Sequence, residues 1–163
     1  MKCILIDPAK QKVGRTEVNP YSDNRHVRRI IRCSDCQPMS LSNGLELCWN
    51  HLGMLEVWED PSVAKKGFFV LINNQGTPLN FCLGRALIWK SDGAFDLLPL
   101  PDFINPDHAA KFVRFIQPAN YAAAVEICVE MFTTCYDERK NQEWLWRALA
   151  LCDSPMFPGV RHA

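Results

Sequence analysis

The sequence predicts an α+β fold: a meander of short, mostly antiparallel strands with one early helix, followed by a helical C-terminal part packed on the same core. Up to about residue 100, short apolar segments alternate with turn residues. Beyond Pro101 the composition shifts to longer segments with helical periodicity. A chain of 163 residues is also long enough to bury a core. We therefore expect an α+β domain over 1–100 and a helical extension over 101–163 that shares its core.

The N-terminal part predicts a β-hairpin and then a short helix. Lys2–Ile6 is rich in aliphatic residues and is followed by a turn that begins at Asp7, which is typical of a first strand. Lys12–Val18 is predicted to be its hairpin partner. After a break in the pattern, Ser22 or Asp23 can cap the helix, because their oxygens accept from free backbone N–H groups.

The middle of the chain predicts further short strands. They are expected at Gln37–Leu41, Leu45–Asn50, Met54–Trp58, Gly67–Ile72, Arg85–Lys90 and Phe95–Leu100. Asn43 and Gly44 predict a tight hairpin turn between the first two. Gly67–Ile72 is almost purely apolar, as in a strand that is buried on both faces.

Three helices are expected in the C-terminal part. Asn105 as N-cap and Pro106 at the first helical position predict a helix that runs to Gln117. Ala122–Phe132 is apolar enough for a mostly buried helix. Asn141–Cys152 predicts a third, with apolar residues at helical spacing.

The chain up to about Leu100 resembles a family of uncharacterised proteins of phages and prophages, the domain of unknown function 3846 (DUF3846). The matching segments are Lys2–Pro8, Val27–Cys33, Leu41–Leu47, Pro78-Leu79 and Gly84–Gly93. The family brings no established activity or catalytic residue. The resemblance implies a mobile-element origin and a host bacterial cytoplasm. Cys36, Cys48 and His51 depart from the family's pattern, so a metal site built from them would be this chain's own addition.

Composition agrees with a cytoplasmic setting. The chain is 48% hydrophobic and 22% charged, which is typical of soluble globular proteins. No apolar segment approaches the roughly 20 residues of a membrane span, and the apolar N-terminal stretch is too short for a signal peptide. We therefore expect no membrane partner. In a reducing compartment the 8 cysteines would be thiols or metal ligands rather than disulfides.

Four arginines, Arg25, Arg28, Arg29 and Arg32, fall at i, i+3, i+4 and i+7 and therefore on one face of the early helix. The apolar residues between them form an opposing stripe that would dock on a sheet. A row of guanidinium groups can bind phosphates or the carboxylates of a partner. The alternative is a solvated outer face.

Two cysteine-containing motifs give a candidate metal site. Cys33-x-x-Cys36, followed after eleven residues by Cys48-x-x-His51, supplies the three thiolates and one imidazole of a tetrahedral zinc site. Strand phase argues against the site, because Cys48 and His51 face opposite sides of a strand unless the chain turns at Asn50. The alternative is that the cysteines are small core residues and His51 an exposed turn residue. We therefore expect no cofactor, with zinc as the alternative.

Enzyme chemistry has less support. A cysteine nucleophile needs a nearby histidine and an orienting acid, and no such local arrangement surrounds the remaining cysteines. Phosphate-loop and dinucleotide patterns are absent. Trp144 and Trp146 could stack on bases, but core or subunit packing is the favoured role.

The leading hypothesis is a non-enzymatic, phage-type accessory protein that binds a host or phage macromolecule through the four arginines, for instance as an inhibitor of a host defence system. The formal net charge of zero favours a protein partner over nucleic acid. The alternative is a small zinc-binding, nucleic-acid-interacting module that uses Cys33, Cys36, Cys48 and His51. An enzyme acting on a nucleotide is a third reading, and a homodimer stays open.

Overall fold

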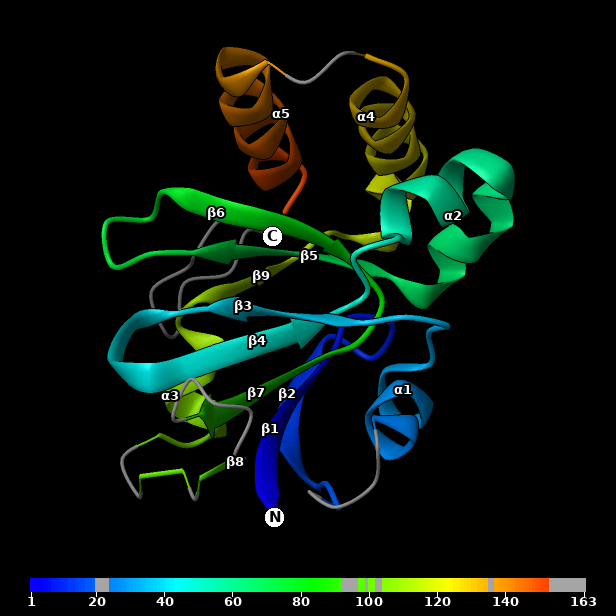
Figure 1. Cartoon of the computed structure of the whole chain (residues 1–163). Coiled ribbons are helices and arrows are strands. Elements are labelled where there is room, and N and C mark those ends of the chain that lie inside the picture. The colour runs from blue at the N-terminus through cyan, green and yellow to red at the C-terminus, as the bar shows by residue number, and fades with distance from the viewer. Residues whose placement is uncertain (20–23, 92–96, 99, 102–103, 135–136, 153–163) are drawn as a thin grey trace.

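Two antiparallel sheets and five α-helices form the part of the chain that the computed structural model describes, residues 1–19, 24–91, 97–98, 100–101, 104–134 and 137–152 (Figure 1). The predicted α+β class is confirmed. The strands divide between two sheets rather than forming one continuous meander.

The first sheet has the strand order β2-β1-β7-β4-β3, with β8 paired to β7. Its strands are β1 (Lys2–Asp7), β2 (Lys12–Glu17), β3 (Gln37–Ser40), β4 (Leu45–Trp49), β7 (Ala86–Ser91) and β8 (Leu97–Leu98). β1 and β2 form the predicted hairpin, and β3 pairs with β4 as expected. β7 is the central strand and joins these two hairpins, because it pairs with both β1 and β4.

The second sheet has the order β6-β5-β9 and lies between the first sheet and the C-terminal helices. Its strands are β5 (Phe68–Ile72), β6 (Pro78–Leu83) and β9 (Val113–Phe115). Every residue of β5 is buried, as its apolar sequence predicts. Phe68, Val70 and Ile72 pack into a cluster with the C-terminal helices. Phe69 and Leu71 point the other way, into a cluster with β1, β4 and β7.

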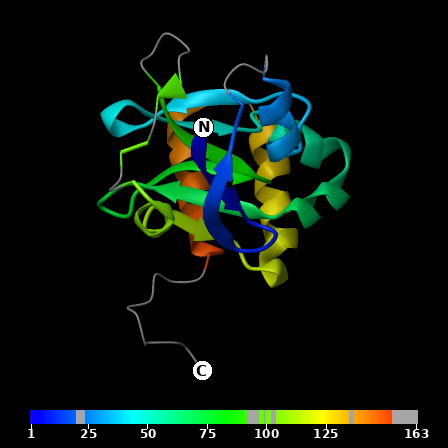
Figure 2. The ribbon, with the colours of Figure 1, turned by 90° about the horizontal axis from the view of Figure 1, so that it is seen from below.

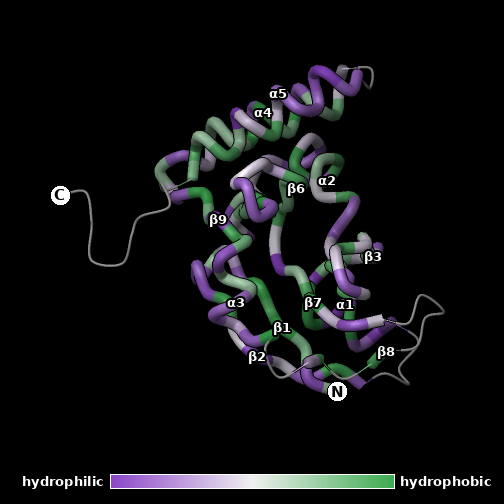
Figure 3. Tube along the Cα trace, turned by 90° about the vertical axis from the view of Figure 1, so that its left-hand side faces the viewer, coloured by the Kyte–Doolittle hydropathy of each residue, from purple (hydrophilic) through white to green (hydrophobic). Residues whose placement is uncertain are grey.

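The helices cover both outer sides of this pair of sheets. They are α1 (Arg25–Ile31), α2 (Gly53–Glu59), α3 (Pro106–Ala110), α4 (Tyr121–Thr133) and α5 (Glu138–Ala150). α4 and α5 pack against the second sheet. α1 docks on the outer face of the first sheet, where Val27 and Ile31 join Leu87 and Trp89 in a third core cluster. The tube in Figure 3 is accordingly hydrophobic along β1 and β7.

Two expected elements differ from the structure, and one strand was not expected. Residues 54–58 belong to helix α2 instead of a strand, because the chain leaves the sheet at Asn50 and then buries Gly53 and Val57 one helical turn apart. The helix that begins at Pro106 ends at Ala110, and β9 then supplies an antiparallel partner to β5. Pro78–Leu83 is a strand that the sequence did not predict.

Several predicted helix ends agree with the structure, and the predicted caps of α1 lie outside the residues it describes. The Asn105 side chain accepts from the backbone N–H of His108 at 2.9 Å, which confirms the predicted cap of α3. α4 and α5 match the helices expected at 122–132 and 141–152 to within a turn. Ser22 and Asp23, the expected caps of α1, lie outside the described residues, as do Phe95, Asp96 and Pro99 of the strand expected at 95–100, whereas Leu97–Leu98 form β8. Within the described ranges, no helix has the length and apolar character to cross a membrane.

Candidate metal centre and arginine face

Strand register places Cys48 beneath α1. Cys48 lies on β4 opposite Leu87 of β7 and Pro38 of β3, and it is 2% exposed. Its side chain belongs to the core cluster between α1 and the first sheet. Cys33 and Cys36 pack against the same cluster. We call Cys33, Cys36 and Cys48 the thiol cluster.

The end of α1 delivers Cys33 to this place. Arg32 takes a left-handed conformation, with φ of 62°, and its N–H donates to the carbonyl oxygen of Arg28 at 2.7 Å. The N–H of Cys33 donates to the same oxygen at 3.2 Å, which is a common way to end a helix. The chain then turns through Asp35, whose carboxylate accepts from the N–H of Cys36 at 3.0 Å. Cys36 immediately precedes β3, next to the end of β4.

Asn50 turns the chain after Cys48. β4 ends at Trp49, and the buried Asn50 side chain accepts from the N–H of Leu52 at 3.1 Å and donates to Glu56 at 2.8 Å. The N–H of Gly53 donates to the Asn50 carbonyl at 3.2 Å. His51 is therefore the first residue of a turn and does not continue the strand. Cys48 and His51 therefore need not face opposite sides of a strand, because the chain turns at Asn50 between them.

The three thiols lie close enough to one another to affect each other's ionisation. Interaction with Cys33 and Cys48, followed by the nearby charge of Arg28, lowers the pKa of Cys36 against the opposing effect of burial. Interaction with Cys36, together with burial, raises the pKa values of Cys33 and Cys48. A negative charge in the thiol cluster is therefore shared among coupled sulfurs.

His51 lies at the edge of the thiol cluster with an unsatisfied ring nitrogen. Its Nδ1 is buried and has no hydrogen-bond partner, although the side chain as a whole is 21% exposed. Its Nε2 lies 3.6 Å from Oδ2 of Asp35. Burying a polar atom without a hydrogen-bond partner costs free energy, so the position of this nitrogen needs a physical explanation.

Cys33, Cys36, Cys48 and His51 are thus brought to one place by the fold. As the side chains stand, however, the described residues contain no group of three or more His, Cys, Asp or Glu that could hold a metal ion. Three sulfurs and an imidazole are the donor set that zinc prefers. The residues match zinc in kind, but as they stand neither the three cysteines alone nor the cysteines with His51 form a closed site.

The four arginines lie beside the thiol cluster on the outside of the fold. Arg25, Arg28, Arg29 and Arg32 are all exposed, whereas Val27 on the opposite side of the helix is buried. We call these four residues the arginine face. Its fourth member is displaced from the predicted row, because Arg32 lies past the last helical residue in a left-handed conformation. α1 and α2 lie on the same side of the molecule (Figure 1 and Figure 2), and Lys66 connects them by donating to the Arg32 carbonyl at 3.4 Å and pairing with Glu56 at 3.6 Å.

An ion pair between Asp7 and Arg85, which the sequence did not predict, anchors α1 to the first sheet. Nη2 of Arg85 lies 2.7 Å from Oδ2 of Asp7, and its Nε donates to the same oxygen at 3.0 Å. Nη1 of Arg85 also donates to the carbonyl of Ile30 at 3.4 Å. The pair spans β1 and the start of β7, and nothing in the local sequence of either residue indicates it.

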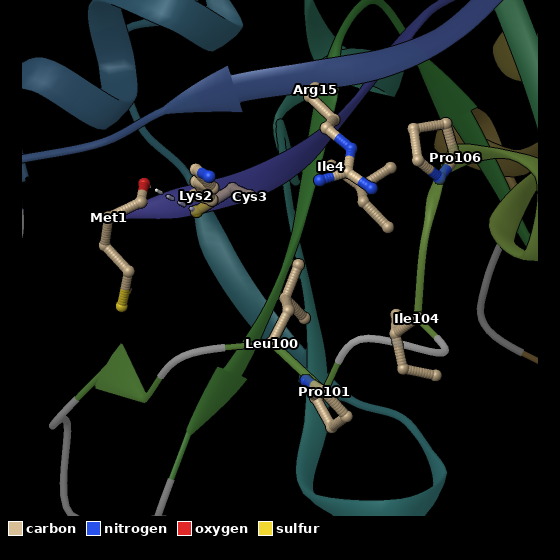
Figure 4. A pocket seen from close by; sticks show the side chains of 9 residues that line it. All are labelled: Met1, Lys2, Cys3, Ile4, Arg15, Leu100, Pro101, Ile104 and Pro106. Atoms are coloured by element: carbon tan, nitrogen blue, oxygen red, sulfur yellow. Dashed lines mark hydrogen bonds between the residues drawn. The ribbon is translucent and has the colours of Figure 1, made fainter.

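A small pocket of about 220 Å³ lies elsewhere, between the start of β1, Arg15 of β2 and the segment around Ile104 (Figure 4). None of the thiol-cluster residues, His51 or the arginine face lines it. The pocket is therefore separate from the candidate site.

Comparisons with known proteins add no identity: no protein-family profile, no curated protein and no solved structure matches the chain. The resemblance to the phage family stays an expectation from the sequence.

Proposed function

We propose that the protein is a binding module, without catalytic activity of its own, that holds an anionic surface of a macromolecular partner against the arginine face. The proposal rests on the two different sides of α1: one side carries exposed guanidinium groups, and the other is buried where the helix docks on the sheet. Val27 and Ile31 fix α1 to the sheet, and the arginines point away from it. A helix held in this way presents its charges in a fixed arrangement, which lowers the entropic cost of binding.

The charges of Arg28 and Arg29 are available to a partner. Within the described ranges, neither side chain forms an ion pair or a hydrogen bond. Among the described acids on this side of the molecule, Asp35 lies beside His51, and Glu56 contacts Lys66 and Asn50. Guanidinium groups that no described carboxylate engages support recognition of carboxylates or phosphates.

A protein partner is our first choice, because a formal net charge of zero supplies no general attraction to nucleic acid. The described cysteines are all free thiols, which supports a reducing compartment such as a bacterial cytoplasm. A partner of phage or host origin fits the resemblance described above.

The test uses a fluorescent poly-glutamate peptide and a short DNA duplex as anionic probes, with affinity measured by anisotropy across a salt series. We expect the peptide to bind at low salt and the Arg28→Glu/Arg29→Glu variant to lose at least tenfold in affinity. The thermal midpoint should stay nearly unchanged, because exposed charges contribute little to folding. The matched control is Arg139→Glu/Lys140→Glu, which reverses two exposed charges on α5.

Equal losses in the two double variants would contradict the proposal, since the arginine face would then be no better than any basic surface. A duplex that binds more tightly than the peptide would shift the assignment to nucleic acid. Its affinity would then fall with salt at a slope of roughly −0.9 per phosphate contacted.

A further inference from the structure

We propose that Cys33, Cys36, Cys48 and His51 form a tetrahedral zinc site that ties the end of α1 to the first sheet. The inference is independent of any partner, because it concerns only residues inside the fold.

The four donors come from four different places in the chain. Cys33 follows the last turn of α1, Cys36 precedes β3, Cys48 lies on β4, and His51 lies in the turn after β4. They form two pairs with two-residue spacing, eleven residues apart, and the three cysteines meet on one side of the sheet. Paired ligands of this spacing on turns are typical of structural zinc sites.

The three cysteines lie in one cluster of the core. Cys48 is buried within it, and Cys33 and Cys36 pack against it. Tetrahedral zinc with bonds of about 2.3 Å to sulfur places its sulfur ligands about 3.8 Å apart. Binding zinc therefore requires the side chains in this cluster to close onto a common centre.

The imidazole supplies the second observation. In zinc sites, one ring nitrogen binds the metal and the other typically donates to a carboxylate that orients the ring. Nε2 of His51 already lies 3.6 Å from the Asp35 carboxylate, and Nδ1 is buried without a partner. We therefore assign Nδ1 as the ligand atom and Asp35 as the residue that positions the ring. The side chains of the cysteines and of His51 have to close onto the metal, because as they stand they do not form a metal-binding group.

The surrounding charges suit such a centre. Three thiolates and one Zn²⁺ leave one net negative charge. Arg28 lies near Cys36, and Lys66 lies near Cys33. Glu56 is also near Cys33, but it is paired with Lys66 and bonded to Asn50. Cations around a thiolate-rich site offset its negative charge.

Zinc content of the full chain, purified without chelator and measured by plasma mass spectrometry, tests the proposal. We expect one zinc per chain in the unaltered protein and less than about a tenth of that in Cys36→Ser and His51→Ala. The controls are Cys152→Ser and His108→Ala, which remove a cysteine and a histidine outside the site and should keep the zinc.

A second variant guards against loss of folding. Asp35→Asn leaves all four ligands in place, and Asp35 is half exposed, so the variant should fold. It should weaken zinc affinity by roughly 10- to 100-fold, as loss of an orienting carboxylate does. Affinity is read by competition with a chromogenic chelator, and Co²⁺ substitution adds a readout, because cobalt bound to thiolates gives an intense charge-transfer absorption.

Three results would overturn the proposal. One is an unaltered protein with no zinc and no cobalt–thiolate absorption after metal is added. Another is zinc that survives in both Cys36→Ser and His51→Ala, which would show an adventitious surface site. The third is quantitative recovery of a Cys33–Cys36 disulfide from protein kept reduced until lysis, which would make the thiol cluster a redox pair. Each of these leaves the arginine-face experiment unaffected, so the two proposals fail separately.

Discussion

Asn50 is the residue that decides what Cys48 and His51 can do together. Its side chain makes both bonds that turn the backbone out of β4 and toward α2, and it is only 2% exposed. An asparagine before a turn is recognisable in a sequence, because its side chain readily bonds a backbone N–H two residues further on. The sequence therefore predicted the possibility of a turn here, and the hydrogen bond to Glu56 explains why it occurs.

Gly67 allows β5 to approach the β1–β2 turn. Its φ is +83°, and a Cβ at this position would lie 2.7 Å from backbone atoms of Pro8 and Ala9. We expect Gly67→Ala to lower the free energy of unfolding through two effects, the strain of a positive φ and the steric clash. Gly76 isolates the first effect, because its φ is +78° and a Cβ there would meet nothing within 4 Å.

Urea denaturation of the two variants separates these effects. Gly76→Ala should cost about 1–2 kcal/mol for the left-handed conformation alone. Gly67→Ala should cost about 1–3 kcal/mol more, because backbone atoms cannot rotate out of the way. Equal losses would mean that β5 and the turn can separate without penalty.

At the scale of the element, helix α4 buries a thiol whose ionisation should limit stability in alkali. Cys128 is 0% exposed, and burial raises its pKa from 9.0 to about 12. A folded pKa above the unfolded value means that the stability is fully present below pH 9. It is lost as the pH rises from 9 toward 12, since only the unfolded chain ionises there.

The slope of unfolding free energy against pH measures this effect. Between pH 9 and 10.5 the unaltered protein should lose up to about 1.4 kcal/mol per pH unit more than Cys128→Ala does. Ala124→Gly is the control, because it removes packing from the same cluster and the same helix without touching a thiol. If Cys128→Ala and the unaltered protein had the same slope, Cys128 would be reachable by solvent in the folded state.

Elements with strong periodicity were predictable from the sequence, and those set by long-range pairing were not. α4, α5 and β5 follow from apolar spacing alone. Residues 113–115 continue a helical pattern locally, yet they form β9 because the edge of β5 is left for a partner strand. Residues 54–58 are equally ambiguous, and only the turn at Asn50 directs them into α2.

The candidate site was predictable in its residues but not in its geometry. Ligand spacing singled out Cys33, Cys36, Cys48 and His51, and helical spacing singled out the arginines. The position of Cys48 in the thiol cluster depends on β4 pairing with β7 and β3, which involves residues up to 45 positions apart, as in Leu45 with Lys90. The ion pair of Asp7 with Arg85 has the same origin, and no local signal announces it.

At the scale of the molecule, the second sheet and the C-terminal helices share one core. Ile116, Ala124, Ile127, Trp144 and Leu145 pack with Phe68 and Phe81 of β5 and β6. A fragment that ends at Pro101 would expose this surface and leave β5 without β9. We expect the fragment to unfold at a far lower urea concentration than the full chain, or to aggregate. A fragment as stable as the full chain would show that residues 1–100 complete their own core.

The proposed zinc site would join the outer helix to the sheet through atoms that lie far apart in the chain, and X-ray absorption at the zinc edge tests that assignment most directly. The account predicts a first shell of three sulfurs at about 2.3 Å and one nitrogen at about 2.0–2.1 Å. His51→Ala should remove the nitrogen contribution from any zinc that is still bound. A shell made only of nitrogen and oxygen would contradict the account, because the metal would then lie outside the thiol cluster.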